Sequence, residues 1–250
     1  MARYFTAANT EYFSTASSPV TTGDSDAYTL AMWFYPAAVD LNYIPLHLWD
    51  DSADLKGHYI HLDNVERVRA SSHSGSSSEQ SIRNGPFVAD VWAHAAAVFA
   101  GSASRIAYYN GAAATPDTAT VGSISADTLW IGARGRGTPS STSAWDGALA
   151  EVAVWQMNLD PAEISILAAG YSPLFVRPNF LKFYAPLNSA KTGDEIDVVG
   201  GLTLTDNGTV TASVPHPRII YPRRRQQILV PSVAAPAAGG GGFLTLLGVG

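Results

Sequence analysis

Short segments in which hydrophobic residues occupy every second position recur between Tyr28 and Trp155. In Tyr28–Tyr35, positions 28, 30, 32 and 34 hold Tyr, Leu, Met and Phe, which gives a strand one apolar face for a sandwich core. Clusters of Gly, Ser, Asn, Asp and Pro separate the further segments His58–Leu62, Arg67–Ser71, Trp92–Phe99, Arg105–Tyr109, Leu129–Gly132 and Ala148–Trp155. This spacing predicts an all-β fold of antiparallel strands in two packed sheets.

Two local signals refine this prediction. Asn110-Gly111 stands between strand-like segments, and both residues tolerate the positive φ of a tight hairpin turn. Asp160-Pro161, followed by Glu163, predicts one short helix, because Asp160 suits the N-cap and Pro161 suits the first helical position.

Composition excludes several classes of function. The chain has no cysteine, so disulfides, thiol catalysis and cysteine-based zinc sites are excluded. The net charge of the chain is −6. Because Ser213–Gly250 contains four arginines and no Asp or Glu, the rest of the chain carries a net charge of −10. Nucleic acid is therefore an unsuitable partner for the body of the protein.

The chain divides by composition and strand pattern into three parts. We expect a sandwich over residues 1–172, a β-rich extension over 173–214 that packs on it, and an extended C-terminal arm over 215–250, rich in Pro, Arg and Gly. The N-terminal residues lack the apolar run of a secretory signal, and Phe243–Gly250 is far shorter than the roughly 20 residues of a membrane helix. We therefore expect synthesis in the cytoplasm and no membrane insertion.

Four segments, in order, resemble the laminin G-like domains of the concanavalin A-like lectin/glucanase superfamily. Val91–Phe99 with Arg105–Gly111 resembles their "W-h-h-v-A-x-x-F … l-Y-v-N-G" hairpin. Leu129–Arg134, Trp145–Trp155 and Leu159–Ile164 look like their "l-x-I-G … F-x-G-x-I-D-E-v-x-v-y … L-s-x-x-E-I" ending. The resemblance covers roughly Ala2 to Gly170 and implies an antiparallel two-sheet jelly-roll sandwich.

Two departures bear on any transfer of site residues from that family. Ala93 stands where a His or another polar residue is usual, and Ala150 replaces the usual acidic neighbour of Glu151. Related glucanases carry Glu-x-Asp-x-x-Glu, whose two carboxylates attack the sugar and donate the proton. Glu195-Ile196-Asp197 begins this motif, but Gly200 stands where the second Glu is required, so we expect no enzyme activity.

One cluster of acidic residues is a candidate metal site. Asp50, Asp51 and Asp54 could supply the carboxylate oxygens that Ca²⁺ prefers from an irregular loop. A solvated hairpin loop is the alternative, because acidic turns are common without metal. Calcium is the single cofactor that the sequence leaves open.

Sugar recognition needs an aromatic platform with nearby polar groups. Trp49, Trp145 and Tyr43 are expected in or beside loops, with Arg134, Arg136 and Asp146 as hydrogen-bonding neighbours. The alternative is that these aromatic side chains pack under loops and complete the core.

The C-terminal arm is a candidate assembly segment. Arg223, Arg224 and Arg225 could pair with acidic groups of a neighbouring subunit, and an exposed basic tail is the alternative. Phe243, Leu244, Leu246 and Leu247 form an apolar end that needs a surface to cover it.

These expectations combine into one hypothesis. Laminin G-like modules generally act outside cells, yet the sequence shows no export signal. A bacteriophage virion protein, assembled in the host cytoplasm, resolves this conflict: a capsid decoration, head-fibre or tail component that presents its sandwich outward, in some cases to a cell-surface glycan. Its arm would contact other virion subunits or copies of itself. The alternatives are an extracellular bacterial carbohydrate-binding module or adhesin and, third, a glycoside hydrolase.

Overall fold

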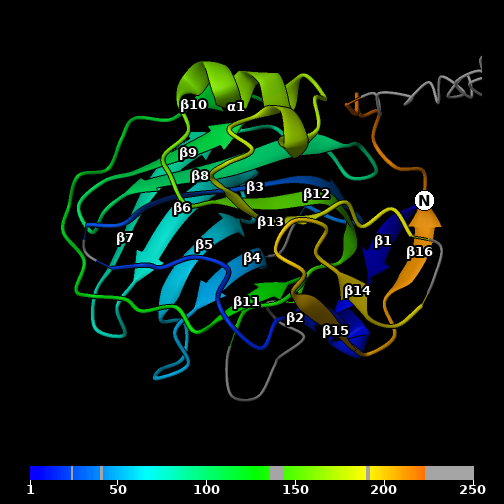
Figure 1. The fold of residues 1–250 in the computed structure, drawn as a ribbon, viewed down its shortest axis with the longest axis horizontal. Coiled ribbons are helices and arrows are strands. Elements are labelled where there is room, and N and C mark those ends of the chain that lie inside the picture. Colours follow the sequence, from blue (N-terminus) through cyan, green and yellow to red (C-terminus); the bar gives the residue numbers. More distant parts are fainter. Residues whose placement is uncertain (24, 40–41, 136–143, 190–191, 223–250) are drawn as a thin grey trace, which may run out of the picture.

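The protein is described by a computed structural model at residues 1–23, 25–39, 42–135, 144–189 and 192–222. Two eight-stranded sheets lie face to face, and every strand pairing is antiparallel (Figure 1). The prediction of an all-β, two-sheet jelly-roll sandwich with one short helix is thus confirmed.

The first sheet carries α1 and the C-terminus of the described chain on its outer side. Its strands, in spatial order, are β10 (Ala112–Ala113), β9 (Arg105–Tyr109), β8 (Ala93–Ala100), β3 (Ala27–Pro36), β12 (Gly147–Trp155), β1 (Ala2–Phe5) and β16 (Thr211–Val214), with β13 (Leu181–Ala185) also paired to β12.

The second sheet forms the opposite layer. Its strands, in spatial order, are β14 (Glu195–Ile196), β15 (Thr203–Asn207), β2 (Tyr12–Ser14), β11 (Thr128–Ile131), β4 (Tyr43–Trp49), β5 (Gly57–Leu62), β6 (Arg67–His73) and β7 (Ser78–Asn84).

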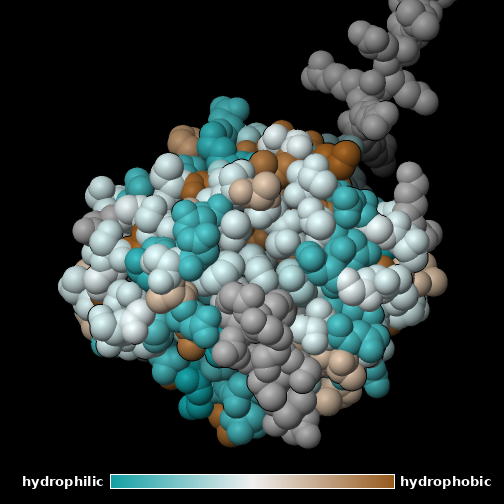
Figure 2. All heavy atoms as spheres, turned by 90° about the horizontal axis from the view of Figure 1, so that it is seen from below, coloured by the Kyte–Doolittle hydropathy of each residue, from teal (hydrophilic) through white to brown (hydrophobic). Residues whose placement is uncertain are grey.

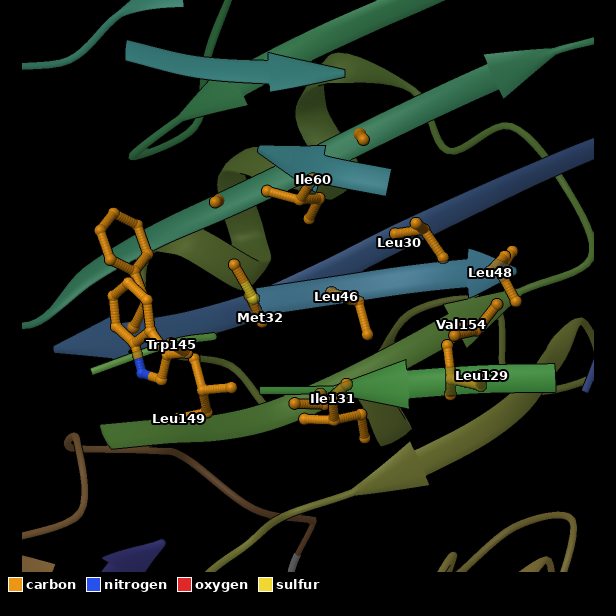
Figure 3. Close-up of a cluster of buried hydrophobic side chains, with 14 of the residues drawn as sticks. Leu30, Met32, Leu46, Leu48, Ile60, Leu129, Ile131, Trp145, Leu149 and Val154 are labelled. Carbon is orange, nitrogen blue, oxygen red and sulfur yellow. The ribbon is translucent and has the colours of Figure 1, made fainter. Parts of the chain in front are cut away.

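The core lies between the sheets because alternate side chains of each strand point inward. Figure 3 shows the labelled side chains of the first sheet meeting those of the second: Leu30, Met32, Leu149 and Val154 against Leu46, Leu48, Ile60, Leu129 and Ile131. All of these are fully buried, and each contributes about 1.5–3 kcal/mol by leaving water.

The predicted helix is α1 (Pro161–Ala168). The Asp160 side chain accepts a hydrogen bond from the Glu163 N–H, and the Glu163 side chain accepts one from the Asp160 N–H, which completes a capping box. Ile164 and Leu167 are buried against the outer side of the first sheet, in a second cluster that includes Trp155 and Tyr184. Two 3₁₀ turns, η1 (Ala7–Asn9) and η3 (Pro173–Phe175), complete the helical segments described. No helix in the described residues is long and apolar enough to cross a membrane.

Residues 173–214 supply strands to both sheets. β13 and β16 extend the first sheet through β12 and β1, and β15 extends the second through β2. β15 pairs with β14, and the next strand, β16, joins the other sheet.

Residues 215–222, which we call the strap, return from β16 across the outer side of the first sheet. The Trp92 indole N–H donates to the Pro215 carbonyl at 3.0 Å. Ile220 donates to the Gly170 carbonyl at 2.7 Å and accepts from the Ser172 N–H at 3.0 Å. The strap therefore ends beside the C-terminal end of α1. The predicted assembly residues Arg223, Arg224, Arg225, Phe243, Leu244, Leu246 and Leu247 lie outside the described residues.

Candidate functional site: the outer face of the second sheet

Strand alternation gives the second sheet a polar and aromatic outer face. Because Leu46, Leu48 and Ile60 point into the core, their neighbours His47 and Tyr59 point outward. Strand register aligns five residues across β11, β4, β5, β6 and β7 in a single row, which we call the cross-strand row: Trp130, His47, Tyr59, Ser71 and Gln80. In the view from the side opposite α1, hydrophilic and intermediate residues predominate (Figure 2).

Aromatic rings form one end of this face. Tyr12 is partly exposed and stacks on Trp130 with ring centroids 4.4 Å apart and planes 5° apart. Trp49 meets Trp130 edge to face at 5.3 Å, and its indole N–H donates to the Ala53 carbonyl at 3.1 Å. Trp49 and Trp130 are only 9% and 7% exposed, so Tyr12 is the ring of this stack that offers most of its surface to solvent.

Charged groups at the other end are held in place by a buried carboxylate. Asp63, whose side chain is fully buried, pairs with Arg67 at 2.7 Å and with Arg69. Burial alone would raise the pKa of Asp63, but hydrogen bonds from both arginines and from the Val65 and Arg67 N–H groups hold that pKa below its ordinary value. Arg69 also donates to the Gln80 side-chain oxygen at 3.0 Å, which orients the end of the cross-strand row.

The middle of the row carries unused hydrogen-bonding capacity. Among the described residues, His47 Nε2, Ser71 Oγ and Thr128 Oγ1 are buried without a hydrogen-bond partner. Unsatisfied buried polar atoms are rare in folded proteins, and each calls for an explanation, such as a bound water or ligand. His47 and Ser71 flank Tyr59 from the two neighbouring strands.

His47 is a neutral donor at this position. Burial, then the nearby His58, Arg134 and His73, lower its pKa to about 3 against the opposing effect of the Lys56 backbone carbonyl, so the ring carries one proton at neutral pH. His47 Nδ1 accepts the Gly135 N–H at 3.0 Å, which assigns that proton to Nε2. A Cβ at Gly57 would lie 2.5 Å from His47 Nε2, so only glycine lets the backbone of β5 pack this closely against the His47 ring.

The residues predicted for sugar binding fall in three different places. Trp49 lies on the outer face of the second sheet, and Arg134 is near enough to lower the pKa of His47 there. Asp146 lies beside Tyr4 of the first sheet, whose pKa rises through burial and then through Asp146. Arg136 lies outside the described residues.

Tyr43 and Trp145 are not part of an exposed platform, so that prediction is wrong for both. They are 2% and 0% exposed, and their rings meet at 5.2 Å within the main core. Tyr43 begins β4 and is not in a loop. The backbone N–H of Trp145 donates to the Gly132 carbonyl at 2.7 Å, which holds the Trp145 backbone beside the end of β11.

The predicted calcium ligands are not gathered around one point. Asp50 is buried and accepts hydrogen bonds from Ser52 Oγ at 2.5 Å and the Ser125 N–H at 3.0 Å, and it pairs with Lys56 at 2.8 Å. Asp51 and Asp54 are exposed. Within the described ranges no group of three acidic or histidine side chains could hold a metal ion, and Asp50 serves the β4–β5 turn.

The residues that resemble half of a glucanase motif are engaged structurally. Glu195 pairs with the buried Arg3 at 2.8 Å. Asp197 accepts the N–H groups of Tyr184, Val199 and Gly200 at 2.7, 3.0 and 2.6 Å. A Cβ at Gly200 would lie 2.6 Å from Asp197 Oδ2 and 2.7 Å from the Lys182 carbonyl oxygen, so this backbone leaves no room for a Glu side chain.

One polar network was not anticipated from the sequence. Glu151 is 2% exposed at an irregularity of β12, and it accepts hydrogen bonds from the hydroxyls of Tyr184 at 2.7 Å and Tyr221 at 2.8 Å. Burial raises the pKa of Glu151 to about 7, against the opposing effect of the two tyrosines. His216 Nε2 lies 3.5 Å from the Glu151 carboxylate, so two strap residues meet this group.

Comparison with known proteins shows which family the chain matches. The family model described as the concanavalin A-like lectin/glucanases superfamily matches residues 7–165. A search of curated proteins found no match to this chain.

Solved structures share the fold at low sequence identity. A candidate carbohydrate-binding protein of Bacteroides ovatus is 16% identical with a TM-score of 0.61, and the match covers 84% of this chain but only 61% of that one. A heptameric SAP-like pentraxin of Limulus polyphemus is 15% identical with a TM-score of 0.50, covering 63% of this chain and 75% of that one. At these identities the likeness establishes the sandwich fold.

Proposed function

Because this chain belongs to the concanavalin A-like lectin/glucanases superfamily, we propose that it is a non-catalytic glycan-binding protein whose ligand lies across the outer face of its second sheet. The observation that carries this proposal is the cross-strand row, in which His47 Nε2 and Ser71 Oγ are buried without partners on either side of Tyr59.

Sugars suit such a face for two physical reasons. Their hydroxyl groups both donate and accept hydrogen bonds, so they can accept from His47 Nε2–H and either donate to or accept from Ser71. Their apolar C–H faces stack on aromatic rings, which Tyr12 offers at the end of the row. Arg69 and Gln80 add oriented donors at the opposite end.

Binding without catalysis is the form of the proposal that the carboxylates favour. A retaining glycosidase needs two carboxyl groups about 5–5.5 Å apart beside the scissile bond. Glu195 and Asp197 are both committed to structural contacts, and Asp63 is held between two arginines.

A glycan array followed by calorimetry on the best ligand tests this proposal. Tyr12→Ala removes the exposed ring of the stack and should weaken binding about tenfold, which corresponds to about 1.4 kcal/mol. Phe180→Ala is the matched control, because Phe180 is an aromatic residue that is 46% exposed just before β13 of the first sheet. No glycan binding by the intact chain, or equal losses in both variants, would overturn the proposal.

The second part of the proposal concerns assembly. We propose a virion structural role, as capsid decoration, head-fibre or tail component, with the arm beyond Pro222 as the anchor to neighbouring subunits. The support is chemical: Ser213–Gly250 holds four arginines, no acidic residue and an apolar end. Mass spectrometry of purified phage particles should detect the protein. Recovery only from the bacterial surface would favour the carbohydrate-binding module or adhesin instead.

A further inference from the structure

Exposed apolar side chains gather where α1, η3 and the strap meet. We call this surface the apolar patch; its members and their exposures are Ile166 42%, Tyr171 40%, Leu174 36%, Phe175 46% and Ile220 50%. Tyr171 and Phe175 meet edge to face at 5.9 Å, and Tyr171 forms a parallel bridge with Ile220. Large apolar side chains grouped in this way mark interaction surfaces.

The patch borders a hollow. A cavity of about 460 Å³ lies between the end of α1 and the strap, lined by Ala169, Arg218, Ile219 and Ile220. A Cβ at Gly170 would lie 2.7 Å from the Arg218 carbonyl oxygen, so the strap can sit this close only against glycine. The hollow is large enough to admit more than one apolar side chain.

The chain itself supplies a candidate occupant. The strap ends at Pro222, two residues after Ile220 of the apolar patch, and 28 residues follow. That arm carries a basic start, Arg223–Arg225, and an apolar end, Phe243–Val249. The spacer 223–242 can span up to about 66 Å when extended, which is long enough to reach the same surface on an adjacent copy.

We propose that the apolar patch of one copy receives the apolar end, Phe243–Val249, of the arm of a second copy. The inference rests on the assembly part of the proposed function and is independent of glycan binding. Each copy carries one patch and one arm, so a two-fold pair exchanges both arms and leaves neither patch uncovered. Phe and Leu side chains then fill the hollow beside Ile219 and Ile220 and leave water.

Light scattering after size exclusion measures the predicted exchange. The full chain should be an oligomer, and both deletion of 223–250 and Ile166→Asp should weaken association at least tenfold. Ile196→Asp is the matched control, because Ile196 is 64% exposed in β14 of the second sheet, and it should associate as the unmodified chain does.

A mixing experiment identifies the partner of the arm. The chain lacking 223–250 retains only a patch, and the Ile166→Asp chain retains only a usable arm, so an equimolar mixture should form a one-to-one complex. Absence of that complex, or a full chain that is a monomer, overturns the inference, including the case in which each arm covers its own patch. Association that depends on 223–250 but not on Ile166 would retain the anchor and reject the patch. Glycan affinity should be unchanged in Ile166→Asp.

Discussion

Two of the buried carboxyl groups, Asp63 beside the second sheet and Glu151 on the first, are held by opposite means. Asp63, on the second sheet, is surrounded by the guanidinium groups of Arg67 and Arg69. Glu151, on the first sheet, meets two tyrosine hydroxyls and the His216 ring. The pKa of Asp63 is consequently lowered, whereas burial raises the pKa of Glu151 to about 7.

The difference means that the contacts of Asp63 persist across neutral pH, which makes Asp63 a permanent support, whereas those of Glu151 depend on pH. Asp63 joins β5 to β6 beside the cross-strand row, and its ion pairs hold over the whole neutral range. Glu151 fastens the strap through Tyr221 and changes its charge near neutral pH. The proposed glycan face is therefore stable to pH, whereas the path from the sandwich to the arm responds to it.

The largest effect is expected from Asp63→Asn. The amide still accepts hydrogen bonds from the Val65 and Arg67 N–H groups but leaves Arg67 and Arg69 without their counter-charge. Loss of a buried partner costs about 3–5 kcal/mol, and partial exposure of both arginines reduces this to about 2–3 kcal/mol. Urea denaturation at pH 7 measures the loss; a change below about 0.5 kcal/mol would contradict the permanent support.

Glu151→Gln should have an effect that depends on pH. The Glu151 pKa is raised in the folded protein, so its contribution to stability is present below about pH 4.5, declines as pH rises, and is gone above the folded pKa of about 7. The wild type should thus lose up to about 3 kcal/mol relative to Glu151→Gln between pH 4.5 and pH 8. Urea denaturation of both proteins across this range tests the sign, and a constant difference would refute the raised pKa.

Tyr221→Phe should sharpen the comparison by a smaller amount. It removes one hydroxyl donor to Glu151 while leaving the ring, which costs about 1 kcal/mol. The effect should be local, so amide hydrogen exchange should quicken at Ile220 and Ser172, whose N–H groups bind across the strap, and remain unchanged at β5 and β6. Faster exchange throughout the sandwich would show that the strap is not a separate unit.

Arg177→Ala sets the lower limit of the scale. Arg177 pairs with Glu163 at the surface, where the arginine side chain is 50% exposed. Exposed ion pairs contribute little, so thermal or urea denaturation should change by less than about 0.5 kcal/mol. A loss of stability as large as that of Asp63→Asn would show that burial of an ion pair does not determine how much the pair contributes to the free energy of unfolding.

Local patterning in the sequence was sufficient for much of the fold. The alternation in Tyr28–Tyr35 became β3, and the Asp160-Pro161-Glu163 signal became the capped helix α1. β4 was missed because every residue of Tyr43–Trp49 is buried and Pro45 interrupts the segment, so no alternation is visible. β7 was missed for the opposite reason, since Ser78–Asn84 is polar on both faces.

The candidate site was harder to predict from the sequence, because it depends on the register between strands. Trp49 was identified from its residue type, but the alignment of His47, Tyr59 and Ser71 requires the pairing of β4, β5 and β6. A shift of one residue would reverse which side chains face outward, and one sequence does not fix that register. The contact of Glu151 with Tyr221 likewise joins residues 70 positions apart.

Backbone amide NMR with the best glycan from the array tests the central claim most directly. Binding at the outer face of the second sheet should shift the signals of Tyr59, Ser71 and Gly135, whose N–H binds His47, and leave those of α1 and β8 unchanged. Shifts confined to the first sheet or to α1 would contradict the assignment of the glycan site.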